Sequence, residues 1–401
     1  MAKYLFCTLH DMKNHMRIIL VFSVLMIAIA SCSSDEPAGT STFGLETEII
    51  YEGSATSERQ VLIKREGSTG SVVKFDYQIS HVSTEEGIDL KAASGSVEFQ
   101  KGVTEVEIPV LVTGDSYHEI IELFKLVLTN ANSTYEYEII ILDDDIMMAP
   151  LSDNDGFYTP AEYNSMRKVW SDEFDGQTLD AKYWTNDVGN GCPNLCQWGN
   201  QELQLYGVQS DVMEVNNGKL TIRAINDNGT YRSARIKTKD KVELTYGRID
   251  IRAKLPRGKG IWPALWALGA NIDTNPWPGC GEIDLMELIG SQPSTVHGTV
   301  HYQDFASKAY RTSGGSTQLN GEEFSQKFHV FTTIWDRNRI EWYLDNKLYN
   351  TFSYPNETGN TFRLPYYFLM NVAVGGRWPG SPDNTTVFPQ EMIVDYIRVF
   401  Q

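Results

Sequence analysis

Apolar and polar residues alternate in short runs along most of this chain, and Gly, Ser or Asp separates one run from the next. Successive side chains of a β-strand point to opposite faces, so this alternation predicts half-buried strands. In the first part of the chain the predicted strands cover residues 60–64, 72–79, 95–99, 105–112, 124–128 and 137–142. Their length and spacing are typical of a β-sandwich of about 100 residues, which we place at residues 43–146.

The same alternation resumes at Val169 and continues to Gln401. The predicted strands of this second domain cover residues 219–224, 247–254, 262–268, 282–288, 295–301, 329–335, 339–344, 367–374 and 393–400. No long amphipathic helix interrupts them, so residues 169–401 are predicted to form a second two-sheet sandwich, and the fold class is all-β. Residues 147–168 have no sustained period and contain Pro150 and Pro160, which indicates a linker.

The N-terminus reads as an export signal, which we place at residues 1–31. Lys13 and Arg17 precede an apolar run of thirteen residues, 18–30, that is too short to span a bilayer comfortably. The Ile-Ala-Ser-Cys that ends at Cys32 resembles a bacterial lipobox, so we expect a lipidated Cys32 followed by a tether, residues 32–42. The expected localisation is the outer membrane or cell surface of a Gram-negative bacterium. The alternative is ordinary secretion with a free Cys32.

Charge narrows the range of partners. The formal net charge of −18 argues against nucleic acid and anionic lipid headgroups, and it is compatible with a neutral polysaccharide. Nine Trp residues suit sugar stacking, although large β-sandwich cores also use many aromatic residues.

Five cysteines are present, two of them in the N-terminal targeting segment. Cys192 and Cys196 lie in a Gly/Asn/Pro-rich loop, where a disulfide is possible in an exported chain. A zinc site is the alternative, but no second Cys/His pair has ligand spacing. Cys280 reads as a small buried apolar residue.

Three carboxylates crowd into one predicted strand, in the run Gly-Glu-Ile-Asp-Leu-Met-Glu at residues 281–287. Glu282 and Asp284 share a face of a regular strand, whereas Glu287 joins them only if a β-bulge inserts one residue near Leu285 or Met286. Paired carboxylates carry out glycoside hydrolysis. An exposed acidic strand face and a metal site are the alternatives that spacing leaves open.

This run resembles the Glu-x-Asp-x-x-Glu signature of glycoside hydrolase family 16, in its laminarinase-like branch with the extra residue. Six further motifs match in order: Trp-Ser-Asp-Glu-Phe-Asp-Gly at 170–176, Trp-Gly-Asn-Gln-Glu-Leu at 198–203, Gly-Ile-Trp-Pro-Ala-Leu-Trp at 260–266, His-Gly-Thr-Val-His at 297–301, Val-Gly-Gly-Arg-Trp-Pro-Gly at 374–380 and Val-Asp-Tyr-Ile-Arg-Val-Phe at 394–400. The resemblance implies a jelly roll whose concave face binds the substrate.

The resemblance also implies a role for each acid. Glu282 would be the nucleophile, Glu287 the general acid/base, and Asp284 would tune Glu282, in a retaining mechanism. The implied activity is endo-hydrolysis of β-1,3-glucan or mixed-linkage β-1,3/1,4-glucan. Two alternatives remain: a galactanase of the same fold that cuts agar or carrageenan, and a non-catalytic glycan-binding lipoprotein.

Other site residues follow from the matched motifs. Those implied to contact sugar are Asn200, Arg235, Trp262, Trp266, His301 and Trp378. The chemistry requires no cofactor. A structural calcium ion on the convex side would use Asp395, with Glu173 and Gly218 as further partners.

The first sandwich resembles a Calx-beta domain. The matching residues are Gly-Ile-Asp at 87–89, Gly-Ser-Val-Glu-Phe at 95–99, Glu-Ile-Ile-Glu-Leu-Phe at 119–124 and Asp-Asp-Asp at 143–145. Some members bind calcium through acidic loops, and the matching acidic positions here are Glu52, Asp89, Asp115, Glu119 and 143–145. These acids could equally be solvated loop residues. We expect this domain to be a spacer or docking module, and the protein to be a monomer.

Overall fold

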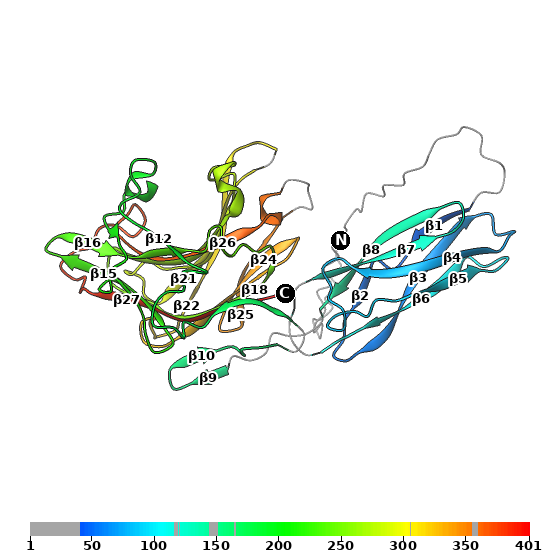
Figure 1. The fold of residues 1–401 in the computed structure, drawn as a ribbon, viewed down its shortest axis with the longest axis horizontal. Coiled ribbons are helices and arrows are strands. Elements are labelled where there is room, and N and C mark those ends of the chain that lie inside the picture. The colour runs from blue at the N-terminus through cyan, green and yellow to red at the C-terminus, as the bar shows by residue number, and fades with distance from the viewer. Residues whose placement is uncertain are drawn as a thin grey trace, which may run out of the picture. The chain divides into compact units, whose positions relative to one another are not determined.

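The computed structural model describes residues 41–115, 119, 121–143, 151–163, 166–304, 306–354 and 360–401. Cys32 and the export signal lie outside the described residues. Nearly all regular structure within them is β-strand, with three short 3₁₀ helices, η1 (Cys196–Gly199), η2 (Ala270–Asp273) and η3 (Thr361–Arg363). The predicted all-β fold class is therefore confirmed (Figure 1). Among these residues no helix is long and apolar enough to cross a membrane.

The first sandwich consists of two sheets. One has the order β1-β3-β6 and the other β2-β8-β7-β4-β5. Their bounds are β1 (Ser41–Leu45), β2 (Ile49–Tyr51), β3 (Ser57–Gly67), β4 (Val73–His81), β5 (Ser94–Phe99), β6 (Glu105–Val112), β7 (Glu122–Thr129) and β8 (Thr134–Leu142). The inward-facing residues Val61, Phe75, Phe99 and Phe124 are fully buried between the sheets. Each of the six strands predicted here overlaps an observed strand.

The second sandwich has a ten-stranded and a seven-stranded sheet. The ten-stranded sheet runs β13-β16-β15-β27-β18-β23-β24-β25, with β11 paired to β27 and β14 paired to β15. Its bounds are β11 (Lys168–Asp172), β13 (Leu205–Tyr206), β14 (Met213–Val215), β15 (Leu220–Asp227), β16 (Thr230–Ser233), β18 (Gly247–Lys254), β23 (His329–Trp335), β24 (Arg339–Leu344), β25 (Lys347–Ser353) and β27 (Gln390–Phe400).

The seven-stranded sheet runs β12-β17-β26-β19-β20-β21-β22. Its bounds are β12 (Thr185–Asp187), β17 (Arg235–Lys237), β19 (Ile261–Gly269), β20 (Glu282–Glu287), β21 (Thr295–Gln303), β22 (Tyr310–Gln318) and β26 (Tyr366–Val374). One large apolar core lies between the two sheets. Ile283 of β20 and Ile251 of β18 point into it, so the polar residues beside them occupy the two outer faces of the sandwich.

The segment that the sequence presents as a linker is partly structured. Its described residues form β9 (Leu151–Asp153) and β10 (Gly156–Tyr158), which pair with each other. Phe157 donates a backbone hydrogen bond to Phe328, and Thr159 donates one to the Tyr396 hydroxyl. These contacts attach residues 151–159 to the outer face of the ten-stranded sheet. Strands of three residues are too short to leave a readable period in the sequence.

Candidate active site

β20 carries one extra residue relative to its neighbours. Thr299 of β21 lies opposite Asp284 and His297 lies opposite Glu287, so three steps along β20 match two along β21. The pairing with β19 shifts at the same place. The predicted β-bulge is therefore confirmed, and it returns Glu287 to the face that already carries Glu282 and Asp284.

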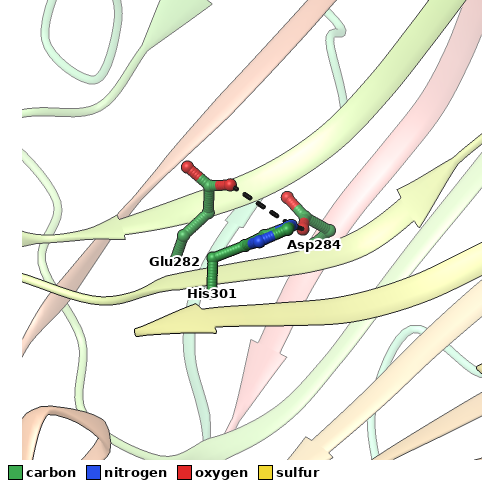
Figure 2. A group of neighbouring side chains, drawn as sticks. All are labelled: Glu282, Asp284 and His301. Carbon is green, nitrogen blue, oxygen red and sulfur yellow. Dashed lines mark ion pairs between the residues drawn. The ribbon is translucent and has the colours of Figure 1, made fainter. Parts of the chain in front are cut away.

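Asp284 is buried, Glu282 and Glu287 are partly buried, and one imidazole lies beside Asp284 and Glu282. His301 Nε2 is 3.3 Å from Asp284 Oδ2 and 3.8 Å from Glu282 Oε1 (Figure 2). The Asp284 side chain is 4% exposed and its Oδ2 makes no hydrogen bond among the described residues. No Lys or Arg forms an ion pair with Glu282, Asp284 or Glu287 in the same residues. Buried carboxylates without a cationic partner are costly, which makes this cluster a candidate for chemistry.

Burial raises the pKa of every acid in the cluster. It raises the pKa of Asp284 to about 8, and, together with the nearby Asp284 charge, that of Glu287 to about 8. The pKa of Glu282 lies well above its usual range because of burial and because Asp284 is close. His301 and Arg235 act in the opposite direction on Glu282 and favour its ionised form.

Tryptophan side chains form a wall beside the acids. Trp262 Nε1 donates a 2.9 Å hydrogen bond to Glu287 Oε1, which lowers the pKa of Glu287 against the effect of burial. The Trp262 ring meets the Trp378 ring edge to face at 5.5 Å. Trp266 Nε1 donates to Asn371 Oδ1 at 2.8 Å, which fixes the second indole. These bonds orient both rings while part of each remains accessible.

Arg235 lies between two indole rings. Its guanidinium carbon is 4.5 Å from the Trp198 ring centre and 4.8 Å from that of Trp266. Its Nε is 3.0 Å from Asp187 Oδ2 on the neighbouring β12. Such packing holds a planar donor group rigidly, as recognition of sugar hydroxyls would require.

Asn200 lies in the loop after η1. Its side chain donates to Glu202 Oε1 at 3.3 Å, and its carbonyl accepts a hydrogen bond from the backbone of Arg377, next to Trp378. The structure thus gathers all six residues predicted to contact sugar around β20: Asn200, Arg235, Trp262, Trp266, His301 and Trp378.

Three aromatic residues of the site were given no role from the sequence. Trp198 follows the disulfide between Cys192 and Cys196, which the structure forms, and covers Arg235. Trp277 and Tyr310 lie on the other side of the acids, with their ring centres 5.4 Å apart and each about half exposed. Trp198 was visible within a matched motif, whereas Tyr310 begins a strand that the sequence pattern did not predict.

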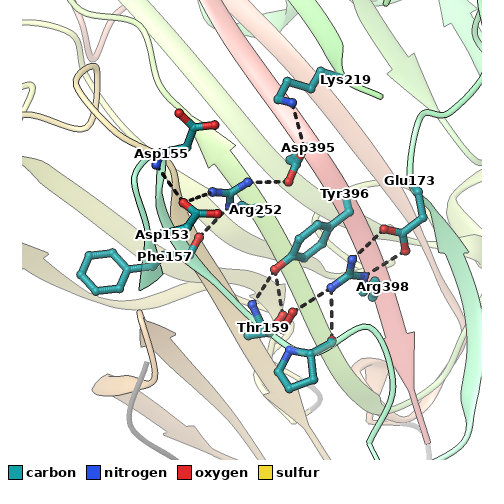
Figure 3. A network of polar contacts seen from close by, with 11 residues as sticks. Asp153, Asp155, Phe157, Thr159, Glu173, Lys219, Arg252, Asp395, Tyr396 and Arg398 are labelled. Carbon is teal, nitrogen blue, oxygen red and sulfur yellow. Dashed lines mark hydrogen bonds and ion pairs between the residues drawn. The ribbon is translucent and has the colours of Figure 1, made fainter. Parts of the chain in front are cut away.

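The two carboxylates predicted to bind calcium on the convex side, Asp395 and Glu173, are bound by cationic side chains instead. Asp395 Oδ2 accepts a 2.7 Å hydrogen bond from Arg252, and Asp395 Oδ1 is 3.5 Å from Lys219 Nζ (Figure 3). Asp153 of β9 also contacts Arg252, at 3.3 Å. Both Asp395 oxygens therefore face a positive charge, and this side chain does not fit a calcium ion in the arrangement shown.

The two other residues of that prediction have different surroundings. Both Glu173 oxygens accept hydrogen bonds from Arg398, at 2.9 and 2.7 Å, and Arg398 also donates to the Thr159 carbonyl (Figure 3). Gly218 has a φ of +68° and contributes no side chain. The calcium ion on this face stays a prediction, and no step proposed below uses it.

The first sandwich has acidic clusters of its own. The carboxylate oxygens of Glu52, Asp115 and Glu119 lie within 4.8 Å of one another, as do those of Asp89, Glu119 and Glu122. Burial raises the pKa of Asp89 to about 6 and that of Glu122 well above its usual range. An all-oxygen donor set fits a hard cation such as calcium. The predicted positions 144 and 145 lie outside the described residues.

Comparisons with known proteins agree with this architecture. The family model described as glycosyl hydrolases family 16 matches residues 199–398, and the Calx-beta domain model matches residues 36–153, which confirms the predicted nature of the first sandwich. A model described as beta-glucan synthesis-associated protein SKN1/KRE6/Sbg1 matches residues 105–275, across the two sandwiches and without the acid strand.

Three similar proteins illustrate the relationship. Glucan endo-1,3-beta-glucosidase A1 of Niallia circulans is 39% identical over 260 residues, which cover 59% of this chain and 38% of that protein. Beta-glucanase of Rhodothermus marinus is 38% identical over 250 residues, which cover 58% of this chain and 84% of that protein. The laminarinase catalytic domain from Thermotoga maritima superimposes with a TM-score of 0.53 at 43% identity, and the match covers 59% of this chain and 98% of that domain.

The matched region contains the bulged acid strand and the tryptophan wall. The chain covers most of a relative at 38% identity, and the family model extends over both sheets of the second sandwich. This chain therefore belongs to glycosyl hydrolase family 16.

Proposed function

We propose that this protein is a retaining endo-β-glucanase that hydrolyses β-1,3-glucan, mixed-linkage β-1,3/1,4-glucan or both. The observation that carries the proposal is the bulge in β20, which brings three carboxylates, one buried and two partly buried, onto one face beside oriented indole rings. The names of the similar proteins, glucan endo-1,3-beta-glucosidase and beta-glucanase, support the same substrate class.

Each acid has a distinct task in this proposal. Glu287 starts protonated, in keeping with its raised pKa, and donates its proton to the leaving glycosidic oxygen. Glu282 attacks the anomeric carbon as a carboxylate, and the bond to the leaving oxygen breaks as the bond to Glu282 forms. Glu287, now ionised, then takes a proton from a water molecule that attacks the anomeric carbon, and the bond to Glu282 breaks as the bond to the water oxygen forms.

The electrostatics of the cluster favour that division. Glu282 and Asp284 are close enough to lose their protons as a pair rather than independently. His301 and Arg235 favour a negative charge on Glu282, and in the proposed mechanism the proton that the pair retains is on Asp284. A protonated Asp284 is a hydrogen-bond donor that can stabilise the leaving carboxylate when the glycosyl-enzyme breaks down.

Endo-action follows from the extent of the site across the sheet. Arg235 and Trp198 lie on the β17 side of the acid strand, whereas the half-exposed Trp277 lies on the β22 side. A polymer crossing the strands would therefore contact aromatic residues on both sides of the bond that is cut. Sugar rings stack on such surfaces through their apolar faces.

The primary test is product analysis of the purified protein on laminarin, mixed-linkage glucan and agarose. We expect a ladder of oligosaccharides from at least one glucan and none from agarose, and NMR should show the β-anomer first. A ladder from agarose alone would replace the proposal with the galactanase alternative, and an α-anomer formed first would exclude retention.

Azide separates the roles of the two glutamates. In Glu282→Gly, azide enters from the vacated side and should give an α-glycosyl azide from an activated glucoside, whereas in Glu287→Gly it should intercept the glycosyl-enzyme and give the β-azide. The exposed Glu243, which lies outside the site, provides the control variant Glu243→Gly. Identical azide products from both site variants would refute the assignment.

We further propose export of the chain as a lipoprotein anchored through Cys32, with the Calx-beta sandwich as spacer or docking module. A calcium ion in that sandwich would be held by Glu52, Asp115 and Glu119, where it would offset the repulsion between their charges. Radiolabelled palmitate should enter the wild type and not Cys32→Ser. Secretion of an unlabelled wild-type protein would contradict the anchor.

A further inference from the structure

Tyr310 is joined to the acid cluster through His301. The Tyr310 hydroxyl and His301 Nδ1 are 2.7 Å apart, and His301 Nε2 faces Asp284 and Glu282. The imidazole therefore bridges a phenol on one side and two carboxylates on the other. The sequence predicted Glu282, Asp284 and His301 in this chain of contacts, but it gave no role to Tyr310.

The strand register explains how Tyr310 reaches the imidazole. His301 lies directly opposite Thr312 in the β21–β22 pairing, and Gln303 lies opposite Tyr310. Tyr310 is thus the diagonal neighbour of His301 on the same face, within reach for an aromatic side chain. The rings are parallel, at 5°, and the Trp277 ring lies 5.4 Å from Tyr310 and 6.4 Å from His301.

The hydrogen bond with the Tyr310 hydroxyl is coupled to the position of the proton on the imidazole. A neutral imidazole has one N–H and one acceptor nitrogen, and the hydrogen bond at one nitrogen sets the state of the other. When Tyr310 donates to Nδ1, the proton of His301 must be on Nε2, where it points at the carboxylates. The alternative tautomer would aim a lone pair at Asp284 and Glu282.

We propose that Tyr310 is a positioning residue that holds His301 as the Nε2–H tautomer against the Glu282–Asp284 pair. The inference rests on the proposed function, since it assigns a task within the same site. His301 thereby directs a donor toward Asp284 Oδ2, which makes no hydrogen bond within the part of the chain that the structure describes. The other charged groups near the pair are Glu287 and Arg235, and neither contacts Tyr310 among the described residues.

Tyr310→Phe removes only the hydroxyl and keeps the ring. We expect kcat/KM to fall about tenfold at the acidic side of the profile, comparable with the loss of partners that orient histidine ligands. An Nε2–H aimed at the carboxylates favours their ionised form, so losing this preferred tautomer should move the profile to higher pH. A purely structural role would lower activity equally at every pH.

Two further variants distinguish positioning from other roles. Tyr302→Phe is the matched control, because Tyr302 is the neighbour of His301 whose ring packs on Phe352 and Phe362, and we expect an unchanged profile. In a His301→Ala background, Tyr310→Phe should have no further effect, as expected for residues that act through one another. A Tyr310 that contacts sugar directly would instead raise KM in both backgrounds, and that result would overturn the proposal.

A readout independent of substrate completes the test. Nitrogen-15 NMR of the full chain should show His301 Nε2 protonated and Nδ1 as an acceptor in the neutral imidazole, and a mixture of tautomers in Tyr310→Phe. The same tautomer ratio in both proteins would refute the inference. If the wild type cleaves no glucan while the tautomer changes, the proposed function fails and the positioning role stands.

Discussion

Both outer faces of the second sandwich contain carboxylates that are at least partly buried. The two faces differ in the partners of these carboxylates. On the ten-stranded sheet Asp250 accepts hydrogen bonds from Arg248, Tyr163 and Thr332, and Arg252 and Arg398 bind Asp395 and Glu173 (Figure 3). On the seven-stranded sheet Glu282 and Asp284 share one imidazole (Figure 2), and Glu287 accepts a hydrogen bond from the neutral Trp262 indole.

This difference distinguishes the structural face, on the ten-stranded sheet, from the candidate active site, on the seven-stranded sheet. A buried carboxylate with matched donors holds strands together, and removing its partner leaves an uncompensated charge. Acids without matched donors shift their pKa upward and become able to exchange protons near neutral pH. The number of acidic residues on a face therefore does not identify the active site. The hydrogen-bond and ion-pair partners of those residues distinguish the catalytic face from the structural one.

The largest expected effect comes from exchanging one glutamate on each face. Glu282→Gln should lower kcat by about 10⁴-fold or more, because the nucleophile is lost, while the unfolding midpoint stays close to that of the wild type. Glu173→Gln on the other face should keep activity within about twofold and lose about 1–2 kcal/mol of stability. Laminarin assays and thermal unfolding of both variants provide the measurement. Equal losses of activity in the two variants would refute the distinction between a catalytic face and a structural face.

Arg248→Met tests the scaffold face directly. It leaves Asp250, which is fully buried, without its charge partner, so we expect a loss of about 3–5 kcal/mol in the free energy of unfolding. All nine Trp residues lie within residues 169–401, so urea unfolding followed by Trp fluorescence reports this sandwich alone. Arg248→Met/Asp250→Asn should recover part of the loss. An unchanged urea midpoint in the single variant would show that the pair contributes nothing.

Glu287→Gln tests how the raised pKa of Glu287 affects the free energy of unfolding. A carboxyl whose pKa is about 4 when unfolded and about 8 when folded binds more protons in the folded state, so the wild type should lose stability as pH rises between these values. Gln cannot ionise, so the variant should lose less and be more stable at pH 8 by about 1–3 kcal/mol. Urea unfolding from pH 5 to 9 measures the two slopes, and a steeper fall in the variant would contradict the raised pKa.

The sequence was sufficient wherever the pattern was regular. The alternation predicted β18, β19 and β26, and the period of 2 required a bulge for Glu287 to join Glu282. Resemblance then located Trp262 and Arg235 near the acids, although their contacts with Glu287 and Trp198 depend on side-chain packing that no pattern encodes.

Other parts of the molecule could not be predicted for physical reasons. β22 has the sequence Tyr-Arg-Thr-Ser-Gly-Gly-Ser-Thr-Gln and is an edge strand with one neighbour. Because it lacks alternating apolar residues, the sequence did not predict this strand, and the position of Tyr310 beside His301 could not be inferred. Asp395 matched a calcium position by its motif, but its pairing with Arg252 and Lys219 joins residues more than 140 positions apart.

The smallest expected effect concerns Trp262 Nε1, the one side-chain donor to Glu287 among the described residues. Trp262 Nε1 lowers the pKa of Glu287, so Trp262→Phe should raise that pKa and move the basic limb of kcat/KM upward by about 0.5–1 pH unit. Trp266→Phe is the matched control, because its Nε1 donates to Asn371 rather than to an acid. Both variants lose part of a sugar-stacking surface, so their maximal rates should fall alike while only Trp262→Phe shifts the profile. Equal shifts in the two variants, or a downward shift in Trp262→Phe, would show that the Trp262 hydrogen bond does not lower the pKa of Glu287.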